Sequence, residues 1–258
     1  MRVNRYRSSS MEINQGVPQG SVLGQLLFLL YINDLPANIH DANLVMFADD
    51  INVLISDSDE RSLQTKIGRV VAEFETWFNR NDLIINARKT GVMLFHNRQT
   101  HFLVKPLITF NKMTVDYTAE IKFLGIQITD TLKWHSHIQS LAHKLCKVAF
   151  MIKSLKELLS PNLIRNIYFT KFHSLLRFGI FFFLGGGSRG ELTTRILRIQ
   201  KRVIRSMVGV SSRTSCRQLF KEMNILTLVS LYIMEVVSYI RKHHQFVELN
   251  SNIHTYST

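Results

Sequence analysis

The chain has 258 residues, of which 46% are hydrophobic and 20% are charged, with 12 glycines and 4 prolines. This composition excludes a disordered or fibrous protein, and the length allows one large domain or two small ones. The net charge of +13 is uneven: residues 1–130 carry 13 Lys and Arg against 14 Asp and Glu (13 − 14 = −1), whereas residues 131–258 carry 19 against 5 (19 − 5 = +14). So basic a half favours a polyanionic partner, either nucleic acid or an anionic membrane surface, over a merely basic surface.

The two cysteines, Cys146 and Cys216, exclude a disulfide framework and a four-cysteine zinc site within the chain. The basic start Met1–Arg7 is not followed by an apolar segment, so no signal peptide is predicted. No apolar run approaches the ~20 residues of a membrane-spanning helix. We therefore expect an intracellular protein without a membrane-spanning helix. The nucleus is a candidate location, although no targeting signal is evident.

The chain begins with a predicted strand and an apolar helix. Residues Glu12–Val17 are strand-like and lead into a turn at Pro18–Ser21, whose serine can cap the following helix. That helix, Val22–Ile32, is apolar nearly all round, which is typical of a helix buried in an interior.

Next comes a predicted hairpin with two carboxylates at its tip. Val, Ile and Phe are frequent in Asn43–Phe47 and Ile51–Ile55, and only Ala48, Asp49 and Asp50 separate these runs. Adjacent carboxylates repel each other and favour a cation, and hard divalent ions such as Mg²⁺ prefer oxygen ligands. Aspartate is also common in ordinary turns, so this pair alone favours a turn without a metal.

The rest of the first half is predicted to contain one amphipathic helix and several strands. The helix, Glu60–Asn79, has apolar residues on one face at Leu63, Ile67, Val70, Phe74 and Trp77. The strand-like runs are Leu83–Asn86, Gly91–Phe95, Leu103–Phe110 and Glu120–Thr129.

From Trp134 onward the pattern is helical, and we place a domain boundary near residue 131. The first helix has apolar residues from Ile138 to Leu155 at alternating spacings of three and four, and Ser160-Pro161 begins another. A flexible break is expected at Gly185–Ser188. A further helix, ending near Gly209, places Leu192, Ile196, Ile199, Val203 and Met207 inside and Arg195, Arg198, Lys201, Arg202 and Arg205 outside. The last two helices are predicted over Ser215–Met223 and Thr227–His243.

The order of these predicted elements resembles that of a known protein family. Gly16, Pro18 and Gly20 fix a tight backbone that a bulky partner can approach. A strand, a Gln-Gly-Ser turn, an apolar helix and a double-Asp hairpin resemble the palm of a reverse transcriptase. Residues Gly16–Pro36 with Phe47–Asp50 closely resemble the polymerase of non-LTR, LINE-type, jockey-like retrotransposons.

The resemblance continues through most of the chain. Asn81–Phe95 is similar to the family's next palm motif, Ile121–Ile126 to its primer-grip hairpin, and Leu132–His137 to the start of its thumb. The implied fold class is α+β. Residues 1–130 would form a partial palm, an antiparallel sheet with packed helices, and residues 131–258 a basic all-α thumb-like domain with a C-terminal extension.

The resemblance also implies an activity and its partners. The chain would be a fragment of an RNA-directed DNA polymerase, a nucleotidyltransferase that copies retrotransposon RNA into DNA by two-metal catalysis. Its cofactor would be Mg²⁺, with Mn²⁺ as an alternative. Its partners would be an RNA template, a DNA primer or RNA–DNA hybrid, and deoxynucleoside triphosphates, without a membrane partner.

The roles of single residues are implied by the same resemblance. Asp49 and Asp50 would be catalytic and bind metal, with Lys89 near the triphosphate. Gln19, Gly20, Ser21, Phe47 and Ala48 would line the nucleotide and template side, and Phe123, Leu124 and Gly125 would form the primer grip. The nucleic-acid backbone would be held by Lys144, Lys147, Lys153, Arg195, Arg198, Lys201 and Arg202.

The sequence departs from the family in the residues that precede Gly16. The 15 residues before it contain no Asp, whereas family members carry fingers and a palm strand with another metal-binding aspartate there. We therefore expect this chain, expressed alone, to be inactive or nearly so, with apolar palm elements exposed. The alternatives are a non-catalytic nucleic-acid-binding remnant and a group II intron maturase relative. The amino-acid sequence of Gly16–Pro36 favours the retrotransposon lineage over the group II intron maturase.

Two other clusters have ordinary interpretations. His135, His137, His143 and Cys146 are zinc-ligand types, but their spacing matches no common zinc site. The run Phe178–Phe183 is expected in the core rather than as a platform for stacking bases.

Overall fold

The computed structural model describes residues 2–3, 6–7, 16–17, 20–95, 105–110, 112–185 and 190–243. Two compact units result: Met1–Val92 with His101–Tyr117, and Met93–Thr100 with Thr118–Thr258. The main division therefore falls between Tyr117 and Thr118, earlier than the boundary predicted near residue 131. Because of this difference, the hairpin of residues 120–129 belongs to the helical unit.

The first unit is built around one long helix. Its elements are β1 (Arg2–Val3), β2 (Tyr6–Arg7), α1 (Val22–Tyr31), α2 (Leu35–Asn38), β3 (Asn43–Phe47), β4 (Asp50–Leu54), α3 (Glu60–Arg80), β5 (Thr109–Phe110) and β6 (Met113–Thr114). The amphipathic helix predicted from the sequence is confirmed as α3, which buries Leu63, Val70, Phe74 and Trp77. The last three of these pack with Ile32, Leu35 and Ile39 in one apolar cluster.

The described strands pair only two at a time. β1 pairs with β2, β3 with β4, and β5 with β6, all antiparallel, and the second unit adds β7 with β8. Within the described residues, the expected antiparallel sheet is thus a set of separate hairpins. The predicted strand Glu12–Val17 lies largely outside the described residues. Of the predicted strand Leu103–Phe110, residues 105–110 are described, and only Thr109–Phe110 forms a strand, β5.

The prediction that the apolar helix lies in an interior is wrong for this chain. None of the residues of α1 is buried, and Val22, Leu23 and Leu30 are 93%, 61% and 65% exposed. The sequence shows that the helix is apolar on every side, but it does not show what covers it. Its C-terminal end is anchored where Phe28 and the following Ile32 reach the α3 cluster.

The two strands predicted after α3 are also absent. Residues 83–86 have no regular structure, and Val92 makes only an isolated bridge to Tyr117. Leu83 and Ile85 pack against the α3 cluster, whereas Ile84 is 85% exposed. The alternating pattern that predicted a strand is therefore satisfied by packing on a helix, without a partner strand.

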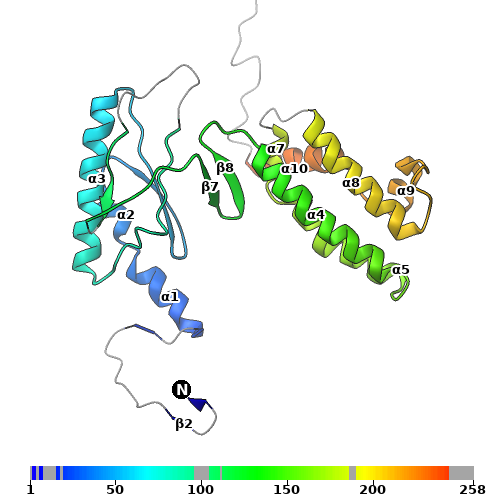
Figure 1. Cartoon of the computed structure of the whole chain (residues 1–258), viewed down its shortest axis with the longest axis horizontal. Coiled ribbons are helices and arrows are strands. Elements are labelled where there is room, and N and C mark those ends of the chain that lie inside the picture. The colour runs from blue at the N-terminus through cyan, green and yellow to red at the C-terminus, as the bar shows by residue number, and fades with distance from the viewer. Residues whose placement is uncertain are drawn as a thin grey trace, which may run out of the picture. The chain divides into compact units, whose positions relative to one another are not determined.

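Within the described residues, the second unit consists mainly of helices and contains one hairpin (Figure 1). Its elements are β7 (Glu120–Phe123), β8 (Ile126–Thr129), α4 (His135–Leu155), α5 (Pro161–Ile167), the π-helix η1 (Tyr168–His173), α6 (Ser174–Arg177), α7 (Ile180–Gly185), α8 (Glu191–Val208), α9 (Cys216–Glu222) and α10 (Leu228–Lys242). These elements confirm the helices predicted from Trp134 onward. The predicted break at Gly185–Ser188 lies almost entirely outside the described residues.

One core holds this unit together. The helices α4 and α8 run side by side (Figure 1) and bury Ile138, Leu145, Ile196 and Val203 in the same apolar cluster. The aromatic run Phe178–Phe183, which lies between these two helices in the sequence, is only partly buried. Phe183 is 1% exposed, but Phe178 and Phe182 are 51% and 53% exposed, so the core interpretation holds only for part of the run.

A buried glutamine joins three segments of the core. The side chain of Gln200 is fully buried, and its Nε2 donates to Tyr168 Oη at 3.0 Å and to Leu226 O at 2.9 Å. Its Oε1 accepts from Leu228 N at 3.0 Å. Burial raises the pKa of Tyr168 to about 12. The glutamine therefore ties α8 to η1 and to the start of α10.

The π-helix lies within a buried stripe that runs from α5 to α6. Ile164, Tyr168, Phe172 and Leu176 follow one another at intervals of four residues and are at most 2% exposed. In a regular α-helix, residues four apart are rotated by about 40°, so such a stripe would drift around the axis. A π turn, with its wider i→i+5 bonding, offsets part of this drift.

Candidate active site and nucleic-acid interface

The predicted double-aspartate hairpin is confirmed. Phe47 pairs with Asp50, so that Ala48 and Asp49 form a two-residue turn. Ala48 has a φ of 52°, the positive value that the first central residue of such hairpin turns adopts. Asp49 and Asp50 are both exposed at this tip.

The strands anchor the hairpin on α3. Leu44, Met46 and Ile51 are partly buried and pack against the apolar cluster that contains Phe74 and Trp77. Because alternate residues of a strand face opposite sides, this contact fixes one face of the hairpin. The tip extends beyond the contact, and Phe47 beside it is 62% exposed.

The glycine turn before α1 is open to a partner. Gly20 has a φ of 84°, and a Cβ atom at this position would meet no atom within 4 Å. Ser21 is at the N-cap of α1, as predicted, but its side chain makes no capping hydrogen bond. Gln19 lies outside the described residues.

Lys89 lies in a turn of the same unit. Asn86 O accepts hydrogen bonds from Lys89 N and Thr90 N, each at 3.0 Å, and the lysine side chain is exposed. Among the described residues, no hydrogen bond or ion pair joins Lys89 to Asp49 or Asp50.

The hairpin tip carries two adjacent carboxylates. Within the part of the chain that the structure describes, no group of three His, Cys, Asp or Glu side chains is placed to hold a metal ion, and this includes the histidines and cysteine at the start of α4. Two adjacent carboxylates fit one hard divalent cation whose other ligands come from water or phosphate.

The primer-grip-like hairpin packs on the helical unit. Leu124 and Gly125 form its two-residue turn with φ values of 44° and 87°, as a type I′ turn requires. A Cβ at Gly125 would lie 3.3 Å from the ring of Phe178. The amide of Gln127 donates to His137 Nδ1 on α4 at 3.3 Å. The turn of Phe123–Gly125 is therefore held by helix side chains.

The seven predicted backbone-binding cations lie on α4 and α8 but do not share one surface. Lys153 and Arg202 line a cavity between the two helices. Lys147, six residues before Lys153, is rotated from it by about 120° around α4. Arg195 and Arg202 are seven residues apart and share a face of α8, whereas Lys201 is rotated by about 100° from Arg202. The remaining two, Lys144 and Arg198, are exposed.

The comparison with protein families decides the assignment. The model described as "Reverse transcriptase (RNA-dependent DNA polymerase)" matches residues 1–128, the segment that contains the Gly20 turn and the aspartate hairpin. Residues 1–128 belong to the reverse transcriptase family, and the chain as a whole is similar to its jockey-like members.

Curated relatives agree with this membership. The chain is 25% identical over 234 residues to "RNA-directed DNA polymerase from mobile element jockey" of Drosophila melanogaster, which covers 86% of this chain and 25% of that protein. It is 25% identical over 259 residues to "Probable RNA-directed DNA polymerase from transposon X-element" of the same organism, covering 98% of this chain and 28% of that protein. The chain thus spans about a quarter of the length of these two relatives.

Two further findings complete the comparison. No solved structure matches the chain. No helix in the described ranges combines the length and apolar character needed to cross a membrane.

Proposed function

We propose that this reverse transcriptase chain supplies the metal-binding hairpin and the nucleic-acid grip of an RNA-directed DNA polymerase that copies retrotransposon RNA. The observation that carries the proposal is the exposed Asp49-Asp50 tip, anchored on α3 inside the segment that the family model matches. The substrates would be an RNA template, a DNA primer and deoxynucleoside triphosphates.

Different residues of the first unit would bind the metal ion, neutralise the leaving group and admit the substrate. Asp49 and Asp50 would hold Mg²⁺ or Mn²⁺. Such an ion, when bound, neutralises phosphate charge and lowers the pKa of an attacking hydroxyl. Lys89 would neutralise charge on the leaving pyrophosphate, and the open backbone at Gly20-Ser21 would let the template or nucleotide approach.

The second unit would hold the template and primer. The turn Phe123–Gly125 would contact the primer end, and the cations of α4 and α8 would bind phosphates without reading bases. We infer that this unit is the thumb-like part of the polymerase.

Two-metal catalysis needs more carboxylates than this hairpin provides. We therefore propose that the 258-residue chain alone binds a divalent cation but extends a primer poorly or not at all. If it retains binding to hybrid without binding metal, the non-catalytic alternative is favoured instead.

Mn²⁺ binding measured by electron paramagnetic resonance tests the hairpin. We expect Asp49→Asn and Asp50→Asn each to weaken binding by about tenfold, because each removes one charged oxygen ligand. The matched control is Asp82→Asn, which removes an exposed aspartate from the end of α3 in the same unit and should leave binding unchanged.

Primer extension is measured in parallel, with Mg²⁺ and with Mn²⁺. Mn²⁺ affinity that is equal in all variants would refute the metal-binding role of the hairpin. Robust extension that Asp49→Ala abolishes would instead show that the chain contains the further ligand.

A further inference from the structure

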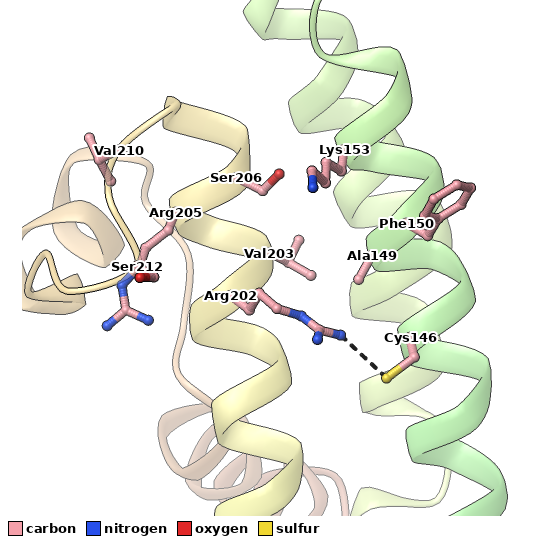
Figure 2. A pocket seen from close by; sticks show the side chains of 10 residues that line it. All are labelled: Cys146, Ala149, Phe150, Lys153, Arg202, Val203, Arg205, Ser206, Val210 and Ser212. Atoms are coloured by element: carbon pink, nitrogen blue, oxygen red, sulfur yellow. Dashed lines mark hydrogen bonds between the residues drawn. The ribbon is translucent and has the colours of Figure 1, made fainter.

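A cavity of about 480 Å³ lies between α4 and α8, within the helical unit (Figure 2). Its walls come from Cys146, Ala149 and Lys153 on one helix and Arg202, Val203 and Ser206 on the other. A volume of this size lies within the range of cavities that bind small ligands or single nucleotides.

The polar groups of this cavity are cationic or neutral. Figure 2 shows the amine of Lys153 and the hydroxyl of Ser206 facing each other across the gap, while the guanidinium of Arg202 extends from α8 toward α4. None of the described residues that line the cavity carries a carboxylate. In the described ranges, neither Lys153 nor Arg202 forms an ion pair. Two uncompensated cations on facing helices repel each other and favour an anion between them.

The contact that Arg202 makes inside the chain is weak. Its Nη2 donates to Cys146 Sγ at 3.4 Å. A thiol is a weak acceptor, and a guanidinium has several N–H groups arranged to bind phosphate in a bidentate manner. The guanidinium therefore points into the cavity and retains donors for a stronger acceptor.

Arg205, which also lines the cavity, is engaged in a hydrogen bond within the chain. Its Nε donates to Thr214 O at 2.7 Å, which ties the loop after α8 to the helix. Val210 and Ser212 of this loop close one end of the cavity. Arg205 therefore holds a loop that forms part of the cavity wall. Lys153 and Arg202 are the cations that a ligand would contact.

We propose that the α4–α8 cavity is a phosphate-binding site, with Lys153 and Arg202 as its cationic ligands and Ser206 as a hydroxyl donor. The inference deepens the proposed function, since it assigns one phosphate of a bound polyanion or nucleotide to a discrete site. The phosphate belongs either to a nucleic-acid strand or to a free nucleotide.

Cys146 reports directly on occupancy. The thiol is free, partly exposed and lines the cavity, whereas Cys216, the other cysteine, is 4% exposed and serves as an internal reference. A phosphate bound beside Cys146 blocks access and disfavours the thiolate, so alkylation slows. The rate is measured by mass spectrometry of the full chain after treatment with N-ethylmaleimide.

The experiment compares three probes: an RNA–DNA hybrid, a deoxynucleoside triphosphate and inorganic phosphate. We expect several-fold protection of Cys146 by at least one of them. Protection at the lowest concentration by the hybrid identifies a strand phosphate, and protection at the lowest concentration by the triphosphate identifies a nucleotide; both support the site. Unchanged alkylation with all three probes overturns it.

Matched variants separate this site from general charge. Lys153→Gln and Arg202→Gln should each raise the probe concentration for half-protection by about tenfold, because each removes a charge-assisted contact. Lys221→Gln, which removes the same charge from an exposed position of α9 that does not line the cavity, should change it little. An equal effect of Lys221→Gln overturns the discrete site.

A second readout does not depend on the thiol. The protective probe should raise the melting temperature of the wild type and of Cys146→Ser, but not of Lys153→Gln. A rise that is equal in Lys153→Gln counts against the proposal. Because Mn²⁺ binding at Asp49 and Asp50 is measured separately, failure of the metal site and failure of the phosphate site give different results.

Discussion

At the scale of single residues, His137 connects the β7–β8 hairpin to the helices. Its side chain is 7% exposed, its Nδ1 accepts from Gln127 N, and its Nε2 has no hydrogen-bond partner among the described residues. The ring lies against Phe183, with centroids 5.7 Å apart. Burial, reinforced by the charge of Lys144, lowers the pKa of His137 below its usual 6.5.

This pKa shift predicts a loss of stability in mild acid. A histidine whose pKa is lowered by folding takes up its proton more readily in the unfolded chain, so the free energy of unfolding falls as the pH drops below about 6.5. Protonation also removes the acceptor for Gln127 N. Burial and the charge of Arg177 lower the pKa of His173 too, against the opposing charge of Glu235, and this histidine contributes with the same sign.

Urea unfolding at a series of pH values measures the effect. His137→Gln keeps an acceptor but does not titrate, so its stability should depend less steeply on pH below 6.5 than that of the wild type. His135→Gln, at an exposed position two residues earlier, should keep the wild-type dependence. An unaltered pH dependence in His137→Gln would refute the assignment.

At the scale of elements, two glycines show opposite constraints. Gly209 ends α8 with a φ of 78°, and the amides of Gly209 and Val210 donate to Arg205 O at 2.9 and 3.1 Å. Gly68 lies inside α3, where an added Cβ would meet no atom within 4 Å. The first glycine is needed for its backbone conformation, and the second weakens its helix.

Alanine at each position should therefore act with opposite signs. Gly209→Ala should lower the free energy of unfolding by about 1 kcal/mol, because alanine is strained at positive φ. Gly68→Ala should raise it by about 0.5–1 kcal/mol, since alanine favours a helix interior. Differential scanning calorimetry measures both, and stabilisation by Gly209→Ala would contradict the helix cap.

The same elements show how far the sequence predicts this fold. The helices α3, α4 and α8 follow from their spacing of apolar residues, because a helix with one apolar face must pack that face. The aspartate hairpin follows from a two-residue turn, which is also local. By contrast, α1 is apolar on every side, and Leu83–Asn86 alternates like a strand; in both cases the missing information is the partner, which no local pattern contains.

The residues of the candidate site also differ in whether the sequence predicts their positions. Asp49 and Asp50 are recognisable from the sequence because they are neighbours in a short turn. The packing of Gly125 on Phe178, the buried Gln200 network and the meeting of Lys153 with Arg202 all join residues that are at least 26 positions apart. A polar residue on an apolar helix face was the only sequence signal for Gln200.

At the scale of the whole molecule, the second unit has one continuous apolar core, whereas in the first unit the described residues leave α1 largely exposed. Leu23, Leu26 and Leu30 lie three and four residues apart on α1 and are 61%, 54% and 65% exposed. Residues with this spacing form one face of a helix. A continuous apolar face of this kind promotes association in water.

We expect concentration-dependent self-association that depends on this face. Static light scattering should give a higher mass for the wild type than for the triple variant Leu23→Gln, Leu26→Gln, Leu30→Gln. Leu158→Gln removes a leucine that is 78% exposed in the second unit and should not reduce the mass. A wild type that remains monomeric at all concentrations would show that α1 does not drive association.

The π turn of η1 sets the orientation of the residues after it along the chain. An α-helix that gains or loses one residue turns every later side chain by about 100°. A regular α-helix of the same length in place of η1 would thus rotate the segment beyond it, including Leu176 and Phe178, relative to Ile164. Phe178 would no longer meet Gly125. The extra width of one helical turn is therefore what fixes the phase between these helices and the hairpin turn that they support.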